Sequence, residues 1–188
     1  MGHKLVWTSL TLLALAAAEA GAQKRFEPPM RLGVPFPAAW KAMLEVLQRE
    51  EWELVKKDRG RGEIVTGYRN YMSGPLTAGH LDKIGVRPRL PDGEWVRVRY
   101  RYDLSVSLIR ERQTMVTVDS DIQALKRDFL GREEWVEIDS TGRVEKQLLT
   151  AFGQTLYGAD FSLDKRRKGI LGLPPIGEGR APAKPPGN

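Results

Sequence analysis

Three arginines at alternate positions are the strongest candidate for a contact surface in this sequence. Arg97, Arg99 and Arg101 share one side of the chain if this segment is a strand, because successive side chains of a strand point to opposite faces. Guanidinium groups recognise carboxylates and phosphates through paired hydrogen bonds. The simpler interpretation is a solvated sheet face on which the arginines pair with Asp119 and Asp121.

Asp119 and Asp121 form a second pattern with chemical potential. Two carboxylates at alternate positions of a strand share a face and can hold a divalent cation through oxygen atoms. Because arginines occupy the neighbouring face positions, we favour charge pairing and predict no metal and no cofactor. His80 is the only histidine after residue 22, and a lone histidine builds neither a histidine-rich metal site nor a Ser-His-Asp relay. We keep His80, whose simpler interpretation is a surface histidine, with the arginines as a candidate for partner binding.

Catalytic signatures are missing from the chain. The sequence has no cysteine, which excludes thiol nucleophiles, thiolate metal sites and lipid attachment through an N-terminal cysteine. It also contains no glycine-rich phosphate loop, no GxSxG elbow and no HExxH helix. We therefore expect a protein that is not an enzyme.

Residues 1–22 have the pattern of a cleavable secretory signal. Lys4 provides a positive start, an apolar run covers residues 5–18, and small residues at 20–22 suit signal peptidase. The run is shorter than the ~20 apolar residues that span a bilayer, so an uncleaved anchor is the weaker alternative. We predict cleavage before Gln23 and a soluble periplasmic or secreted product.

The positive charge is concentrated at the C-terminus. The chain has a formal net charge of +6, and six basic residues with one acidic residue lie within residues 165–188. The excess therefore belongs to a tail rather than to a folded face, and we exclude nucleic acid as a partner. We expect residues 161–188, rich in proline and glycine, to be a disordered tail. At most, it makes weak contact with anionic membrane or cell-wall polymer.

Between these ends, the spacing of apolar residues predicts two helices and several strands. Pro37 suits the first turn of a helix that continues to residue 51, and a second helix covers residues 143–157. Strands are expected at residues 52–57, 63–71, 95–110, 115–125 and 134–138, with Ile64, Thr66 and Tyr68 on one face of the second. Residues 72–94 form an unusually long connection that can contain a helical turn at 77–84.

The clearest structural signal is a long hairpin over residues 95–125. Apolar residues occupy the even positions and polar residues the odd ones, which predicts one buried face and one wet face. A turn centred on Glu111 places Arg101 opposite Asp121 and Leu104 opposite Val118. Fully extended, the first strand would measure ~50 Å at ~3.3 Å per residue, so we expect a bulge or a hairpin that overhangs the sheet.

Together these elements predict an α+β fold in the order helix, hairpin, long hairpin, helix. We expect an antiparallel sheet of about four to five strands with two helices packed on one face. Residues 23–35 are an extended lead-in, and residues 36–160 form one domain.

Several segments also resemble the repeated domain of the outer-membrane assembly lipoproteins of the NlpB type, component C of the β-barrel assembly machine. This resemblance covers residues 36–157 and implies a module of two helices and an antiparallel sheet that binds proteins in the bacterial envelope. The chain departs from the family because it lacks the lipid-attachment cysteine and has one copy of the domain. The similar segments are Ala39-Trp40-Lys41 with Leu44 and Leu47, residues 52–55, Asp58-Arg59, residues 62–66, and residues 145–149.

We therefore expect a non-enzymatic envelope module that binds a protein or an envelope polymer, and the resemblance implies a link to outer-membrane assembly. Its contacts would come from the wet sheet face and residues 72–94. The alternative is a small periplasmic ligand carrier or hydrolase with a pocket between residues 72–94 and the sheet. A pocket that holds His80 beside a carboxylate would favour this alternative.

Overall fold

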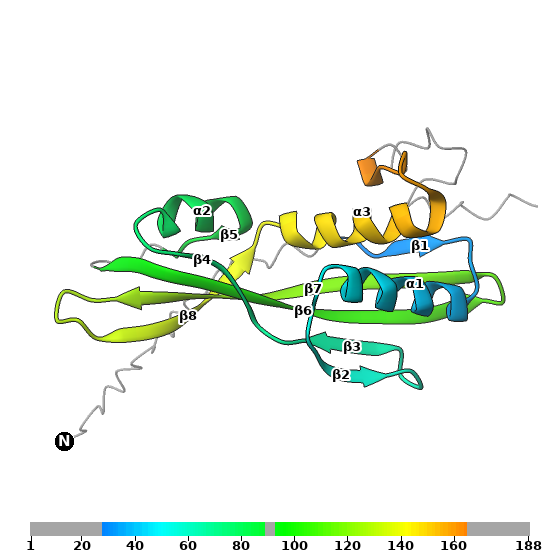
Figure 1. Cartoon of the computed structure of the whole chain (residues 1–188), viewed down its shortest axis with the longest axis horizontal. Helices are drawn as coiled ribbons and strands as arrows, with labels where there is room; N and C mark the ends of the chain where they lie inside the picture. Colours follow the sequence, from blue (N-terminus) through cyan, green and yellow to red (C-terminus); the bar gives the residue numbers. More distant parts are fainter. Residues whose placement is uncertain (1–27, 89–92, 165–188) are drawn as a thin grey trace, which may run out of the picture.

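A computed structural model describes residues 28–88 and 93–164 (Figure 1). The expected signal at 1–22 and the tail from residue 165 lie outside this part. The helices are α1 (Phe36–Arg49), α2 (Thr77–Ile84) and α3 (Arg143–Tyr157). The strands are β1 (Met30–Leu32), β2 (Leu54–Asp58), β3 (Glu63–Thr66), β4 (Arg69–Ser73), β5 (Gly85–Val86), β6 (Glu94–Arg110), β7 (Gln113–Arg127) and β8 (Glu133–Ser140).

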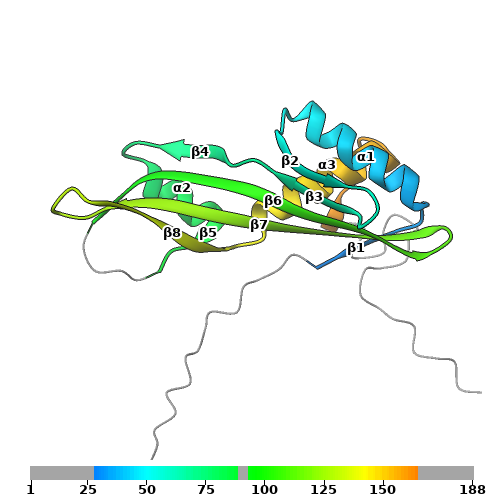
Figure 2. The same cartoon turned by 90° about the horizontal axis from the view of Figure 1, so that it is seen from below.

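The long β6–β7 hairpin forms the centre of the sheet. The eight strands form one sheet in the order β2-β3-β6-β7-β8-β5, with β1 paired to β7 and β4 paired to β6. Figures 1 and 2 show β6 and β7 running along the molecule, with the β6–β7 turn at one end and the β7–β8 turn at the other. Strands β3 and β4 pair successively with the same edge of β6, so the sheet is long and narrow.

The fold is α+β, but our prediction of four to five strands and two helices is wrong. The described residues contain eight strands and three helices. Strands β1 and β5 have three and two residues, too few to show any periodicity. The expected strand at 63–71 is divided into β3 and β4, and the expected helical turn at 77–84 is the complete helix α2.

The predicted register of the long hairpin is confirmed. Arg101 lies opposite Asp121, and Leu104 lies opposite Val118. The register shifts between Trp95 and Arg97 and again near the turn, so the long hairpin contains bulges. Because the first shift adds one residue to β6, Trp95 lies opposite Lys126 and joins the face that carries the helices.

The core lies between one sheet face and the three helices, as the two views show (Figures 1 and 2). Helices α1 and α3 cover one half of this face, and α2 covers the other half. The even-numbered residues of the hairpin point into this core, with Val98, Tyr102 and Leu104 all buried. The expected dry face of the hairpin is therefore confirmed, except at its exposed tip, where Leu108 lies beyond the helices.

The packed region is longer than the expected domain at 36–160. Met30 and Leu32 of β1 are buried, so part of the expected lead-in belongs to the sheet. Phe161 and Leu163 are also buried, so the packed region extends past residue 160. Phe161 packs on α3 at Gly153, where an added Cβ would lie 2.0 Å from the phenylalanine ring.

Buried polar groups join α3 to the sheet. The Tyr102 hydroxyl donates to the Val144 carbonyl at 2.9 Å. The Ser120 hydroxyl donates to Oε1 of Glu145, whose side chain is almost fully buried and whose Oε2 has no hydrogen-bond partner.

None of the helices in residues 28–88 and 93–164 is long and apolar enough to cross a membrane.

Candidate functional site

From Arg97 onward, the odd-numbered residues of the hairpin lie on the sheet face that no helix of the described residues covers (Figure 2). We call this surface the open face. Arg97, Arg99 and Arg101 lie on it, as predicted, because they alternate with buried residues along β6. His80 lies on α2, on the helix-covered side, where its ring is 6.3 Å from that of Tyr71. The structure therefore groups the three arginines but does not bring His80 to them.

Aromatic rings and guanidinium groups alternate across the open face. The Arg99 guanidinium carbon lies 3.8 Å from the centre of the Trp135 ring and 4.5 Å from that of Tyr68. The Arg101 guanidinium carbon lies 4.9 Å from the centre of the same Tyr68 ring. We call Trp135, Arg99, Tyr68 and Arg101 the cation–π ladder. Each such contact contributes about 0.5–1 kcal/mol at an exposed site.

Hydrogen bonds hold the central ring of this ladder. The Tyr68 hydroxyl donates to Asp121 and accepts from Nε2 of Gln123 at 2.8 Å. Partial burial, together with the hydrogen bond to Asp121, raises the pKa of Tyr68 to about 12. The tyrosine therefore stays neutral at physiological pH and acts as a fixed donor rather than a nucleophile.

The three arginines differ in their partners. Arg101 forms an ion pair with Asp121 at 3.1 Å. Arg99 donates from Nε and Nη2 to Oε1 of Gln123 at 3.0 and 2.7 Å, so its partner is neutral. Arg97 is exposed and has no hydrogen bond or ion pair within residues 28–88 and 93–164. The expected pairing with carboxylates therefore holds for Arg101 alone.

Asp121 is occupied by hydrogen bonding and charge pairing. Its carboxylate accepts from Tyr68 and contacts Arg101. The described residues contain no group of three or more histidine or carboxylate side chains that could hold a metal. On the open face, the carboxylates of Asp119 and Asp121 therefore place negative charge among the arginines.

Sequence reasoning missed three members of this surface. It placed Tyr68 on the same face as Ile64 and Thr66. The strand is instead interrupted after Thr66, at Gly67, and Tyr68 points to the open face. Arg69, the next residue, pairs with Tyr100 and lies on the other side. Gln123 lies on β7 and Trp135 on the neighbouring strand β8, where Trp135 pairs with Leu125, two residues along the chain from Gln123. Their parity could have placed them on the open face, but not in contact with Arg99.

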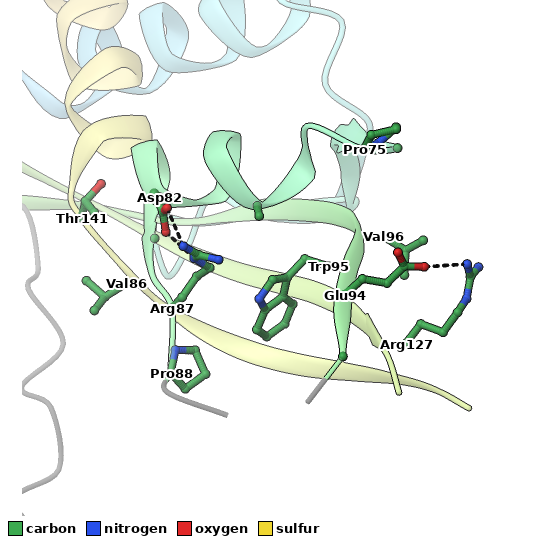
Figure 3. A pocket seen from close by; sticks show the side chains of 14 residues that line it. Pro75, Asp82, Val86, Arg87, Pro88, Glu94, Trp95, Val96, Arg127 and Thr141 are labelled. Carbon is green, nitrogen blue, oxygen red and sulfur yellow. Dashed lines mark hydrogen bonds and ion pairs between the residues drawn. The ribbon is translucent and has the colours of Figure 1, made fainter. Parts of the chain in front are cut away.

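A cavity of about 990 Å³ lies between the α2–β5 segment and the start of β6 (Figure 3). Trp95 lines it because of the bulge in β6, together with Val86 and Pro88. The charged groups at its wall are paired with each other: Arg87 contacts Asp82 at 2.8 Å, and Arg127 contacts Glu94 at 3.0 Å. His80 is not among the lining residues. The described wall thus lacks the histidine and carboxylate pair that would favour a hydrolase.

No protein-family model matches this chain, and no curated protein matches it in sequence.

Proposed function

We propose that this protein is an exported, non-enzymatic module of the bacterial cell envelope that binds a protein or an envelope polymer on its open face. The observation that carries the proposal is the cation–π ladder on a sheet surface that the described helices leave uncovered. An isolated solvated face does not require an arginine such as Arg99 to contact two aromatic rings, here Trp135 and Tyr68. Ordered side chains lose less conformational entropy when a partner binds.

The composition of the open face supports binding rather than catalysis. Tryptophan, tyrosine and arginine are the residues that most often dominate binding energy at protein interfaces. The ladder consists of these three types only. A reaction would need a nucleophile or a proton carrier near neutral pKa, whereas Tyr68 has a raised pKa and Asp121 is held in two contacts.

The resemblance of residues 36–157 to the NlpB-type domain is consistent with a role beside outer-membrane assembly. The sequence differs from that family in its lack of cysteine, and residues 1–22 have the pattern of a secretory signal. We therefore place it in the periplasm or outside the cell.

Photocrosslinking from defined surfaces tests the proposal. A photoreactive residue replaces Asn70 or Ser105 on the open face, and Gln147 on the outer side of α3 in the matched control; all three positions are exposed. The full chain is produced in a bacterium, and fractionation with N-terminal sequencing reports export and cleavage. We expect one discrete crosslinked species from the open-face positions only. The same species from Gln147, or retention of the chain in the cytoplasm, contradicts the proposal.

The cavity beside Trp95 favours a second candidate function, that of a small-molecule carrier. Its volume lies at the upper end of the range typical of ligand sites. Native mass spectrometry of the purified protein tests this function: a co-purifying small molecule that is lost after Trp95→Ala supports the carrier. Unliganded mass in both proteins contradicts it.

A further inference from the structure

One edge of β7 is open between two neighbouring strand pairings. On the side of β7 that faces away from β6, β1 pairs with residues 114–116 and β8 pairs with residues 122–127. Within the part of the chain that the structure describes, no strand pairs with residues 117–121 on that side. We call this stretch of β7 the edge gap.

Backbone groups in the edge gap point outward and need partners. The N–H of Tyr102 on β6 donates to Oγ1 of Thr66 at 2.8 Å, on the side away from β7. In an antiparallel pair, the residue opposite then also turns its N–H and carbonyl outward, and Ser120 lies opposite Tyr102. The side chain of Ser120 is buried, and its N–H donates to the carboxylate of the adjacent Asp119 at 3.1 Å. A side chain thus occupies the place where a neighbouring strand would supply a carbonyl group.

The chain itself leads into the edge gap. Strand β1 is antiparallel to β7, and its first residue, Met30, lies opposite Val116. If the chain continues in this direction, residues 25–29 lie along the whole gap. The prolines at 28 and 29 lack an N–H, which a strand at a sheet edge tolerates, and each favours an extended backbone in the residue before it. Direction and length therefore both match.

The charges of the two segments are opposite. The positions of β6 and β7 beside the edge gap carry three carboxylates and one arginine, a local net charge of −2. They are Asp103, Asp119, Asp121 and Arg101. Residues 23–27 contain two basic residues and one acidic residue, and cleavage before Gln23 adds a positive α-amino group. Long-range attraction therefore favours this segment at the gap.

We propose that residues 23–27, which lie outside the described part of the chain, dock in the edge gap as an added strand once the signal has been cleaved. This inference rests on the proposed function, because it takes Gln23 as the first residue of the exported chain. In the register of β1, Arg25 lies beside Asp121 on the open face, and Phe26 faces the helix-covered side.

The edge gap suits the cleaved chain better than the precursor. Just beyond the gap, Ile138 of β8 lies opposite Ile122 and occupies the same edge of β7. A chain that begins at Gln23 has only Gln23 and Lys24 beyond the gap, whereas the precursor would have to carry residues 1–22 past β8. Signal cleavage therefore allows the sheet to be completed.

A disulfide between two introduced cysteines tests the inference, because the chain has no cysteine of its own. In the proposed register Glu27 lies opposite Asp119, and directly opposed residues of antiparallel strands are close enough for this bond. We expect Glu27→Cys with Asp119→Cys to form an intramolecular disulfide in a chain that begins at Gln23, released from a cleavable tag.

Glu27→Cys with Ser105→Cys is the matched control. Ser105 is exposed on the same open face, but it lies on β6, two strand spacings from the edge gap. That separation is about 10 Å, too far for a disulfide. We expect no bond in this pair, and circular dichroism confirms that both double variants are folded.

Hydrogen exchange measured by NMR gives a second readout that needs no cysteine. We expect the Ser120 amide to exchange about tenfold more slowly in a chain that begins at Gln23 than in one that begins at Pro28, because docking supplies a strand carbonyl group. The Val116 amide is the internal control, since β1 remains paired beside it in both chains.

Three results overturn the inference: equal disulfide yields in the two cysteine pairs, no disulfide in either pair, or unchanged exchange at Ser120. A disulfide that links two chains shows that a second copy occupies the edge gap, and it overturns the inference as well. N-terminal sequencing of the exported chain reports separately on the proposed function. A chain retained with its signal removes that function, whereas the chain that begins at Gln23 still tests docking in the gap.

Discussion

The Arg99 guanidinium lies over the Trp135 ring, with its central carbon 3.8 Å from the ring centre, and its Nη2 donates to Oε1 of Gln123 at 2.7 Å. Arg99 and Trp135 come from strands that do not pair directly, since β7 lies between β6 and β8. Their contact therefore ties together the three strands at the centre of the open face.

Removing the Trp135 ring tests the energy of this contact. Trp135→Leu keeps an apolar side chain but removes the ring face, so we expect the free energy of unfolding to fall by about 1 kcal/mol. Trp135→Phe, which retains a ring, should lose less. Urea denaturation measures both variants. A Trp135→Leu protein as stable as the original would show that the ladder adds nothing to the fold.

The buried carboxylate of Glu145 predicts a coupled pair of substitutions. Ser120→Ala removes its donor and leaves a buried carboxyl group without a hydrogen bond, so we expect a loss of about 1–3 kcal/mol. The double variant Ser120→Ala with Glu145→Leu removes both polar groups, and its stability should return to within about 1 kcal/mol of the original. A thermodynamic cycle from urea denaturation measures the coupling. Additive effects of the two substitutions would contradict it.

Two helical glycines should respond to alanine in opposite directions. At Gly153 the new Cβ would lie 2.0 Å from the Phe161 ring, and overpacking of this kind costs about 1–3 kcal/mol. At Gly79 in α2 nothing lies within 4 Å of the new Cβ, so Gly79→Ala should add roughly 0.5–1 kcal/mol through helix propensity. Thermal unfolding compares the two variants. A stabilised Gly153→Ala protein would mean that Phe161 does not pack on α3.

Titration of Tyr68 tests the hydrogen bond to Asp121. The pKa of Tyr68 is raised to about 12, above the ordinary value near 10. Its contribution to stability is therefore complete below about pH 10 and is lost as the pH rises toward 12. Carbon-13 NMR of labelled tyrosine follows the ring directly, and Tyr68→Phe identifies its signal. Asp121→Asn should lower the pKa, and an unchanged value would show that burial alone sets it.

The alternation of residues 95–125 determined the hairpin, its buried face and the pairing of Arg101 with Asp121. These features depend on local geometry: side chains of a strand alternate with period two, and the turn length sets which residues face each other. The same parity placed Arg97, Arg99 and Arg101 together, and helical spacing located α1 and α3, whereas residues 77–84 were expected only as a helical turn within a long connection.

Only the tertiary structure decided which residues surround the arginines and where the sheet ends. The short strands β1 and β5 exist because distant segments offer them free edges, and no local pattern of two or three residues records such pairing. The break at Gly67 turned Tyr68 to the open face, and the order of the strands brought Trp135 over Arg99. Contacts between segments far apart in the chain depend on the whole packing arrangement, which is why the periodicity of each segment could not reveal the ladder.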